Sequence, residues 1–486
     1  MARFGIGFSF GGRFTTVPDV FLTVNADNLD LRPVTPLGTV AILGVGAGLF
    51  PPGVATSLPL GSGSPQRFIT PSELLTMAEF AAKPFSELDR GAGTVLVVPV
   101  NKSTPSTFAI NATGPSLLAT LTSKGWGLKF NQIQVKIETG VLTLSIPTTT
   151  GTILEIFPYS GATAIADLVD AINQRSALVS AVWTAQGTPV NAAFAPMTGG
   201  TEPAAVTQDW SDALHALDGI RVNTIAIGSS SSTVWAMLAD YAILKRLRGF
   251  FGRGLQNWNG TSNRATALAN LKADAAAINA KRMMHVGLGM EGQPGYLATA
   301  RYAALAATLD PSTPMTFRHL DVASLEARLD PDTEIGPVDG LHINGVAPPM
   351  SDPDAPSTFL VSRGLSTYTG SDNLYDREHS VLAAVDGIED QVNAAMRQVA
   401  LGREGTRATV VRAEAAMDQI LNEATRQRAA VRINSYRPES IHGELVGMVL
   451  YISAAFTPIP PINFVPVSLQ LEQTDIVVNF EVPLTV

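Results

Sequence analysis

The sequence predicts an α/β (α+β) multidomain protein, with a mixed sheet core flanked by helices, an inserted β-rich domain, and extended N- and C-terminal arms. Two observations favour this class. Residues 210–309 alternate short apolar runs with stretches of helical periodicity, as in a sheet covered by helices. Residues 101–196 are instead rich in Thr and in short strand-like runs. A chain of 486 residues is too long for one core, so we expect about two to four domains.

Composition excludes several classes of protein. A hydrophobic content of 45% with 15% charged residues excludes a disordered chain. The absence of cysteine removes disulfides, thiolate metal sites and a Cys nucleophile, and fits assembly in a reducing cytoplasm. No apolar run reaches the ~18 residues of a membrane-spanning helix, and the N-terminus lacks a signal-peptide core, so we expect a soluble chain without a membrane partner. The net charge of −9 argues against a nucleic-acid partner.

The first hundred residues are expected to supply an arm and the first strands of the core. Residues 1–12 are too rich in Gly and Phe to build a core. Residues 39–48 read as a buried strand that runs into a glycine loop. Residues 70–73 open a helix with a cap, a proline in the first turn and an early acid. Residues 94–100 form a near-continuous apolar strand, which predicts that both of its faces are covered.

The periodic patterns then place the elements of the middle of the chain. In the β-rich stretch we expect strands at 107–110, 117–121, 132–138, 141–146 and 153–157, and one helix at 165–179. After it we expect helices at 210–217, 233–248, 265–282 and 294–309. The strands expected there lie at 222–227, 285–288, 341–343 and 359–361.

The C-terminal region begins with two long amphipathic stretches, 381–399 and 410–424, which predict a helical hairpin. The apolar run 445–456 is rich in strand formers, and the proline-rich stretch 457–465 must be extended. The chain closes with an alternating stretch that puts four apolar side chains on one face: Ile476, Val478, Phe480 and Val482. Such a terminal strand pairs in its own sheet, the more frequent case, or in the sheet of another chain.

The motifs that could support catalysis or cofactor binding each lack some of the residues that such a site requires. The glycine loop at 44–48 has a misplaced third glycine, and Pro-Pro-Gly follows where a phosphate-binding helix would begin. The loop 228–233 lacks the Gly-Lys-Ser/Thr ending of a phosphate loop, so Ser232 or a neighbour is expected to cap a helix. The six histidines show no metal-ligand spacing. We therefore expect no catalytic site and no cofactor.

Positive charge is concentrated near the helical hairpin of this acidic chain. Arginines recur between residues 397 and 437, and those expected to form a functional surface are Arg412, Arg426, Arg428 and Arg432. The alternative is an ordinary solvated helix face whose acids and bases pair along the helix, and this alternative stays open.

Several motifs, in order, resemble the contractile phage tail sheath family. The most extensive is the C-terminal "YISAAFTPIPPINFVPVSLQLE", which resembles the family's strand, Pro-rich crossing and closing strand. Upstream, "AILGVGAGLFPPGVA", "GGTEPAAVTQDWSDALHALDGIRVNTIAI" and "VSRGLSTYT" resemble core and C-terminal strands, and "GPSLLATLTSKGWGLKFNQIQVKI" resembles an inserted β-rich domain. "TVPDVFLTV" resembles the family's first strand, with Asp19 in place of the usual Gly; this strand comprises Phe21, Leu22, Thr23, Val24 and Asn25.

The resemblance implies a domain order and a set of partners. It divides the chain into an N-terminal arm (1–33), a core (34–100 and 197–357) with an inserted β-rich outer domain (101–196), a C-terminal sheath domain (358–472) and a C-terminal arm (473–486). It implies a non-enzymatic virion protein assembled in the host cytoplasm as hexameric rings of a helical sheath that contracts around a tail tube, in contact with baseplate and tail terminator proteins. A sheath from a bacteriocin or secretion-type injection system, and a nucleotide-dependent enzyme, are the alternatives.

Overall fold

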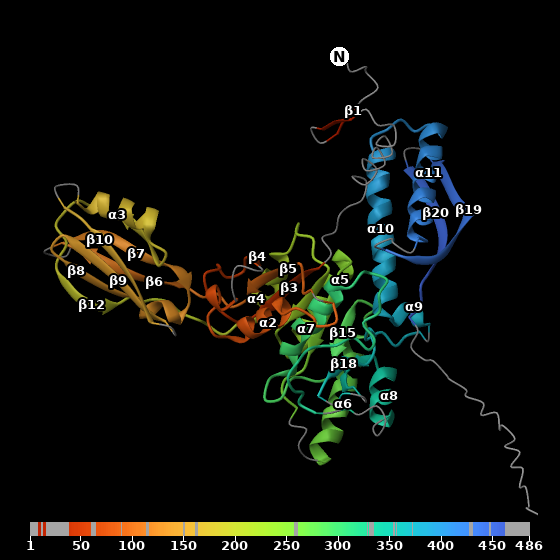
Figure 1. Cartoon of the computed structure of the whole chain (residues 1–486), viewed down its shortest axis with the longest axis horizontal. Coiled ribbons are helices and arrows are strands. Elements are labelled where there is room, and N and C mark those ends of the chain that lie inside the picture. Colours follow the sequence, from red (N-terminus) through yellow and green to blue (C-terminus); the bar gives the residue numbers. More distant parts are fainter. Residues whose placement is uncertain are drawn as a thin grey trace, which may run out of the picture.

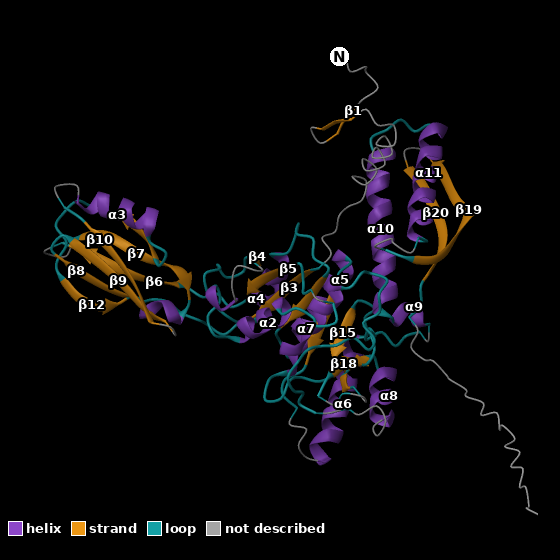
Figure 2. Cartoon of the chain, viewed as in Figure 1, coloured by secondary structure: helices purple, strands orange, loops and turns teal. Residues whose placement is uncertain are grey.

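The structure is a computed structural model of the chain, drawn in Figure 1. It describes residues 8–10, 13–15, 38–59, 65–88, 90–112, 116–148, 151–160, 164–256, 261–327, 329, 335–352, 355, 357–371, 373–426, 431–446 and 449–461. A central α/β body carries a β-rich lobe on one side and a helix–hairpin unit on another (Figures 1 and 2). Apart from these, a short hairpin pairs β1 (Phe8–Phe10) with β2 (Arg13–Thr15).

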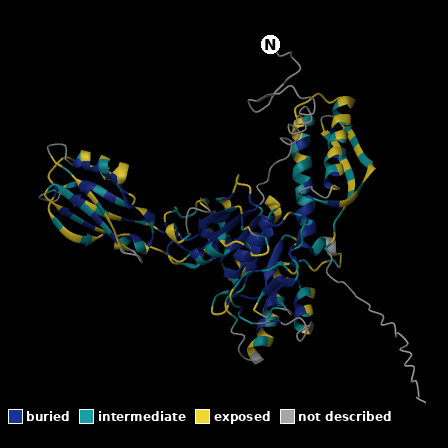
Figure 3. Ribbon diagram, viewed as in Figure 1, coloured by how far each residue is buried: buried dark blue, intermediate teal, exposed yellow. Residues whose placement is uncertain are grey.

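A seven-stranded sheet forms the centre of the α/β body, in the order β16-β15-β14-β13-β3-β5-β4. All neighbours are parallel except β4, which runs antiparallel to β5, so the sheet is mixed as predicted. The strands are β3 (Thr39–Gly44), β4 (Thr56–Leu58), β5 (Thr94–Pro99), β13 (Thr224–Ile227), β14 (Arg248–Gly252), β15 (Met283–Val286) and β16 (Val346–Ala347). Nearly all their residues are buried, because helices cover both faces (Figure 3).

The two faces of this sheet have separate hydrophobic cores. Even-numbered residues of β3, such as Val40 and Ile42, pack with α2 (Glu73–Ala82) and α7 (Gly295–Thr308). Ala41 and Leu43 point the other way and pack with α4 (Thr207–His215) and α5 (Ser232–Lys245). Beside β15 and β16, α6 (Thr261–Ile278) packs on α8 (Ile335–Ile343), and β17 (Pro349–Ser351) pairs with β18 (Phe359–Val361).

The β-rich lobe is a two-sheet sandwich with a core of its own. One sheet has the order β10-β9-β8-β12 and the other β11-β7-β6. The strands are β6 (Pro105–Asn111), β7 (Leu117–Trp126), β8 (Gln134–Glu138), β9 (Val141–Thr148), β10 (Gly151–Pro158), β11 (Val179–Trp183) and β12 (Ala192–Pro196), with one helix, α3 (Ala164–Arg175). Short 3-10 turns occupy Pro65–Arg67 in the body and Leu128–Gln132 in the lobe. Thr104 N–H donates to the Thr201 carbonyl at 3.1 Å, so the two ends of this lobe meet.

Residues 374–458 form a C-terminal unit beside the body. It comprises α9 (Leu374–Arg377), α10 (His379–Val399), α11 (Arg407–Ala424), β19 (Ile433–Val446) and β20 (Val449–Pro458). Ile388 of α10 and Leu421 of α11 share a small core with Ile433 of β19. The predicted helical hairpin is present, followed by a β-hairpin.

Several expected elements differ from the structure. Residues 341–343 end helix α8 and are not a strand; their short apolar run fits either element, and Leu341 packs in a helical contact with α6. The helix expected at 233–248 ends at Lys245, because Arg246 adopts φ 55°, and Arg248 opens β14. The helix expected at 265–282 spans Thr261–Ile278 and ends before Asn279, which has φ 40°.

Two further boundaries also differ. The helix expected at 165–179 ends at Arg175, and Val179 opens β11. The cap of α2 is Ser72, whose hydroxyl accepts from Leu75 N at 3.3 Å, so Pro71 precedes the helix instead of lying in its first turn. The expected strand at Phe21–Asn25 and the C-terminal residues Ile476, Val478, Phe480 and Val482 lie outside the described residues. Within the described part, no helix is long and apolar enough to cross a bilayer.

Candidate functional site

The β19–β20 hairpin is the strongest candidate for an assembly site. It is a two-stranded antiparallel sheet of 14 and 10 residues, and within the described residues neither strand has a second neighbour. Its inner face packs on α11 through Tyr436, Ile452 and Phe456, whereas Val449 and Tyr451 on the outer face are more than half exposed. Free strand edges expose unpaired N–H and C=O groups, so this hairpin can accept strands from elsewhere.

A bulge shapes the β19 side of this hairpin. The register shifts between Arg437 and His442, which face Ala455 and Ser453 of β20. The Ser440 hydroxyl holds the bulge, because it donates to the Arg437 carbonyl at 2.6 Å and accepts from Ala455 N at 2.8 Å. Pro438 lies within the bulge and has no N–H to offer a partner. The bulge therefore limits pairing along β19, whereas β20 has a regular edge over its length.

The charges of α11 are separated between its two faces. Glu414 accepts from Gly443 N and Asp418 accepts from the Tyr436 hydroxyl, each at 2.8 Å, so these acids face the hairpin. Burial, followed by this hydrogen bond, raises the pKa of Tyr436. Arg412, on the opposite side of α11, and Arg426, just beyond the end of the helix, are both exposed, and neither forms an ion pair within the described residues. Glu414 and Asp418 therefore bond to the hairpin and not to these two arginines.

The four arginines of the sequence prediction are only partly brought together. Arg412 lies in the second turn of α11, and Arg426 lies two residues beyond the end of that helix. These two exposed arginines form what we call the basic face. Arg432 is half-buried, with its Nε 3.4 Å from the Ser312 hydroxyl, and Arg428 lies outside the described residues.

Buried and half-buried arginines join the C-terminal unit to the α/β body. Arg282 donates to both carboxylate oxygens of Asp386 on α10, at 2.6 Å each. This pairing raises the pKa of Arg282. Arg248 Nη1 lies 3.2 Å from His379 Nε2, and burial lowers the pKa of both groups. One turn further along α10, Glu389 pairs with Arg246.

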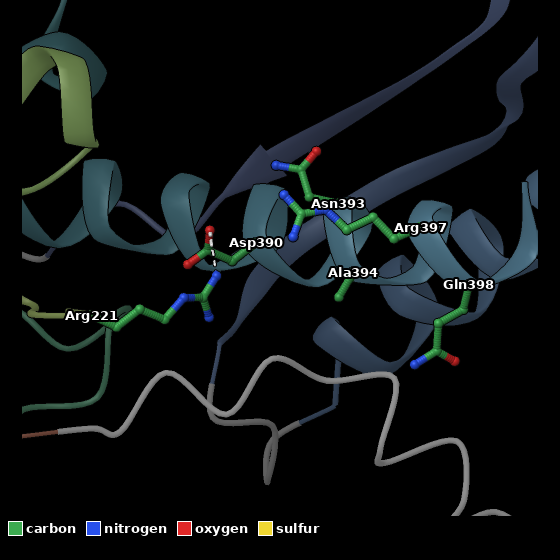
Figure 4. Close-up of a pocket in the computed structure, with 6 residues that line it drawn as sticks. All are labelled: Arg221, Asp390, Asn393, Ala394, Arg397 and Gln398. Carbon is green, nitrogen blue, oxygen red and sulfur yellow. Dashed lines mark ion pairs between the residues drawn. The ribbon is translucent and has the colours of Figure 1, made fainter. Parts of the chain in front are cut away.

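Next to this joint, the body and α10 border a groove of about 280 Å³. Its walls are Arg221, from the loop before β13, and a row of α10 side chains: Asp390, Asn393, Ala394, Arg397 and Gln398. Arg221 Nη2 and Asp390 Oδ1 are 3.8 Å apart (Figure 4). The groove has two cations and one anion, so it favours a ligand with negative charge.

The loops considered for phosphate binding are filled by the chain itself. In the glycine loop, Gly46 N donates to Asn101 Oδ1 at 2.9 Å, and the carbonyl of Val45 accepts from Leu74 N at 3.1 Å. In the serine-rich loop, Ser232 is the first residue of α5 and not its cap. Ser231 is at the N-cap and makes no side-chain cap hydrogen bond within the described part of the chain.

The histidines also give no metal site in the part of the chain that is described. No group of three or more His, Cys, Asp or Glu side chains there is arranged to hold an ion. His342 instead lies 2.9 Å from the Ser362 hydroxyl, and burial lowers its pKa to about 4. Sequence reasoning missed strand β19, whose stretch INSYRPESIHGELV is largely polar; its few apolar residues, Tyr436, Ile441 and Leu445, are a weak signal.

Two curated phage proteins are similar to part of this chain. No protein-family model matches it. The tail sheath protein of Bacillus phage SP01 is 25% identical over 178 residues, which are 36% of this chain and 29% of that protein. The putative tail sheath protein of Enterococcus phage phiEF24C is 26% identical over 211 residues, 43% of this chain and 36% of that protein. The chain thus matches about a third of the length of these relatives.

Two solved structures share the fold over most of the chain. The sheath tail protein of Desulfitobacterium hafniense has a TM-score of 0.63 at 17% identity, covering 87% of this chain and 93% of its own. The sheath tail protein of Listeria innocua has a TM-score of 0.62 at 16% identity, covering 90% and 96%. The α/β fold class and the resemblance found in the sequence are both confirmed. The chain is thus similar to phage tail sheath proteins in part of its sequence, and it shares the fold of the two sheath tail proteins.

Proposed function

We propose that the chain is a structural, non-enzymatic subunit of a contractile phage tail sheath. Copies polymerise as stacked hexameric rings around the tail tube and contract to drive it through the host envelope. The observation that carries this proposal is the β19–β20 hairpin, which projects from the body with open edges in a chain related to sheath proteins. Assembly takes place in the host cytoplasm, and the product is a virion component that also contacts the baseplate and tail terminator.

Strand exchange between subunits is the proposed means of polymerisation. The C-terminal arm, with Ile476, Val478, Phe480 and Val482 on one face, adds to the β19–β20 hairpin of a neighbour. The arm lies beside that neighbour's own N-terminal strand, Phe21–Asn25. Eight residues of arm span about 27 Å, which is shorter than the ten-residue β20 that would receive it. Ladder hydrogen bonds at such a joint persist while the bodies they connect rotate.

Removing the residues after Gln473 tests this proposal. The truncated chain should remain folded and soluble but fail to form sheath-like tubes, because it offers no strand to a neighbour. The matched control removes only Thr485 and Val486, leaves the alternating strand intact and should assemble normally. Electron microscopy and sedimentation report assembly, and circular dichroism reports folding. Regular tubes from the chain ending at Gln473 would refute the role of the arm.

The basic face is proposed to contact the tail tube. Arg412 and Arg426 present positive charge that an acidic tube surface would attract, and the sequence prediction adds Arg428 and Arg432 to this contact. Each exposed pair contributes at most about 1 kcal/mol, but the contact repeats in every subunit of the array.

A further inference from the structure

Four strands lie at the edges of the inserted sandwich: β10 and β12 in one sheet, β11 and β6 in the other. An edge strand exposes unpaired N–H and C=O groups that another chain can bind. Proteins block such edges with bulges, prolines, charges or a covering segment. Within the described residues, β12, β6 and β11 each have a block of this kind, whereas β10 has none.

Two of the blocked edges are those of β12 and β6. A bulge shifts the register of β12 between Ala192 and Ala195, and the strand ends at Pro196. The returning chain covers β6, because Thr107 N donates to the Thr198 carbonyl at 2.6 Å and Thr198 N donates to the Thr107 carbonyl at 3.0 Å. Neither edge therefore offers a partner a regular ladder of hydrogen bonds.

The edge of β11 is closed by one side chain of α3. Asn173 Nδ2 donates to the Ala181 carbonyl at 2.9 Å, and Asn173 Oδ1 accepts from Ala181 N at 2.8 Å. This amide thus occupies the donor and the acceptor that the middle of the strand would offer to a partner. Val182, the next residue, is 64% exposed, so an apolar side chain can be exposed here although the backbone edge beside it is closed.

Strand β10 instead has a regular edge without an available charge. All its residues, Gly151–Pro158, pair with β9 without a shift in register. Glu155 is the one charged residue of the strand, and its carboxylate accepts from Ser176 Oγ at 2.5 Å and from Ala177 N at 2.8 Å. This acid is therefore held by its own lobe and does not guard the edge against a partner strand.

Two prolines show which way the backbone of β10 points. Neither Pro147 nor Pro158 has an N–H, which places both in non-hydrogen-bonded pairs of the β9–β10 ladder. Thr152 faces Pro147, and Leu154 and Ile156 continue the same alternation. The N–H and C=O groups of these three residues therefore point away from β9, towards the open side. The side chains of Leu154 and Ile156 are 55% and 56% exposed.

We propose that β10 pairs with β10 of a second copy of this chain, in an antiparallel ladder centred on Leu154. In this register Leu154 faces the partner's Leu154, and Thr152 faces the partner's Ile156. Each facing pair exchanges two hydrogen bonds, so the three pairs form about six. The two four-stranded sheets then become one continuous sheet that crosses both lobes.

A second copy fits this edge because the edge is self-complementary. A two-fold contact brings identical groups close together, so a charged edge would repel itself. Here Glu155 faces the partner's Ile153, and the exposed Leu154 and Ile156 of both copies gather on one face of the joined sheet. The lobe also projects from the α/β body on the side away from the C-terminal unit, which leaves room for a second lobe (Figure 1).

The two-fold axis determines where this contact can form. It relates copies of opposite polarity, whereas the copies of one ring, as proposed above, share the same polarity. The contact therefore joins free subunits, or lobes on two sheaths that lie side by side. Because each copy contributes a single strand, we expect a weak and reversible dimer.

Single cysteines test the register, because the chain has none of its own. Leu154→Cys should form a disulfide-linked dimer under mild oxidation, since facing Cα atoms of a hydrogen-bonded pair lie about 5.5 Å apart. The two copies of Thr152 lie about 14 Å apart in this ladder, as do those of Ile156. Thr152→Cys and Ile156→Cys should therefore dimerise little alone, whereas a mixture of the two chains should give the mixed dimer.

The matched control is Val182→Cys, which places an exposed thiol on the blocked edge of β11. Leu154→Cys should form its dimer at least about tenfold faster than this control, because the paired strands hold the two thiols together. Non-reducing gel electrophoresis detects the disulfide on the denatured full-length chain, so the formation of tubes does not affect the result.

Leu154→Lys tests whether the open edge holds the dimer. It removes an apolar contact and places two like charges opposite each other, so it should raise the dimer Kd by about tenfold in sedimentation of the unassembled protein. Val182→Lys should leave that Kd unchanged. Both side chains are more than half exposed, so circular dichroism should show the native fold in both variants.

Three outcomes would overturn the proposal. Equal oxidation rates for Leu154→Cys and Val182→Cys would show that the β10 edge does not pair. Equal dimer from each of the three β10 cysteine variants alone would show an association without the antiparallel register. An unchanged Kd in Leu154→Lys would place the contact elsewhere on the chain. The assembly result for the C-terminal truncation is independent of all three.

Discussion

Replacing Asp386 with Ala should loosen the joint between the C-terminal unit and the α/β body. Asp386 accepts two hydrogen bonds from Arg282, and the two side chains are 14% and 17% exposed. Its loss leaves Arg282 poorly compensated and close to the buried Arg248, whose charge Asp386 also stabilises. Removing one partner of a buried pair costs about 3–5 kcal/mol; because this pair is not completely buried, we expect about 3 kcal/mol.

Native-state hydrogen exchange of α10 measures this cost directly. A chain with several cores does not unfold in one step, so a global denaturation midpoint is a poor measure. A cost of about 3 kcal/mol corresponds to roughly a hundredfold loss of amide protection in α10. The control is Glu389→Ala, one turn along the same helix, whose pair with Arg246 is about half exposed and should cost at most about 1 kcal/mol.

The comparison between Asp386→Ala and Glu389→Ala tests whether the Arg282–Asp386 pair holds the joint between the C-terminal unit and the body. Equal loss of protection in Asp386→Ala and Glu389→Ala would show that burial of the Arg282 pair does not hold the joint. The double variant Arg282→Ala/Asp386→Ala should be more protected than Asp386→Ala alone, because it leaves fewer unpaired buried charges.

Three further predictions concern acid stability, the inserted lobe and the tube. Burial lowers the pKa of His342 to about 4, so the unfolded chain binds its proton first and the stability of the region around α8 falls as pH drops from 6.5 to about 4. The shift corresponds to roughly 3 kcal/mol, and His342→Gln should flatten the pH dependence of amide protection in α8, measured by native-state hydrogen exchange. Excising residues 105–200 and joining Thr104 to Thr201 should leave a folded body with native circular dichroism, because these ends already meet and the lobe has its own core. Loss of all soluble protein would show that the lobe belongs to the body. Binding to purified tubes should weaken as salt is added. It should also weaken in the Arg412→Glu/Arg426→Glu variant, but not in the control variant Arg175→Glu on the inserted lobe. Salt-independent tube binding by the Arg412→Glu/Arg426→Glu variant would refute the tube contact.

Sequence patterns predicted the elements whose own residues form a continuous apolar run or carry a clear cap. Strands β3 and β5 were identified from their continuous apolar runs, and helix α2 from its serine cap. These signals depend only on residues that are neighbours in the sequence. Strand β14 was missed, because Arg248 and two glycines surround Phe250 and Phe251 and no local pattern separates the run from the preceding helix. Its strand character comes from its parallel neighbours β13 and β15.

The candidate site was less predictable for a related reason. The terminal strands show clear apolar–polar alternation, but this pattern does not specify the strand with which each of them pairs. Strand β19 was missed because its exposed positions, such as Arg437, His442 and Glu444, are polar and no described segment covers them. The segregation of Glu414 and Asp418 from the exposed arginines also depends on which face of α11 meets the hairpin, which helical spacing alone does not specify.

The interleaved order of the central sheet has a consequence for synthesis on the ribosome. Strand β3 lies between β5 and β13, and β13 begins 125 residues after β5 ends. At about 5–20 residues per second, the nascent chain waits roughly 6–25 s for that neighbour, while the inserted sandwich is already complete. The hairpin of the C-terminal unit emerges after the body. Under the strand-exchange proposal, a growing chain therefore offers no receptor to another subunit until its body can close, and translation order delays polymerisation until folding is finished.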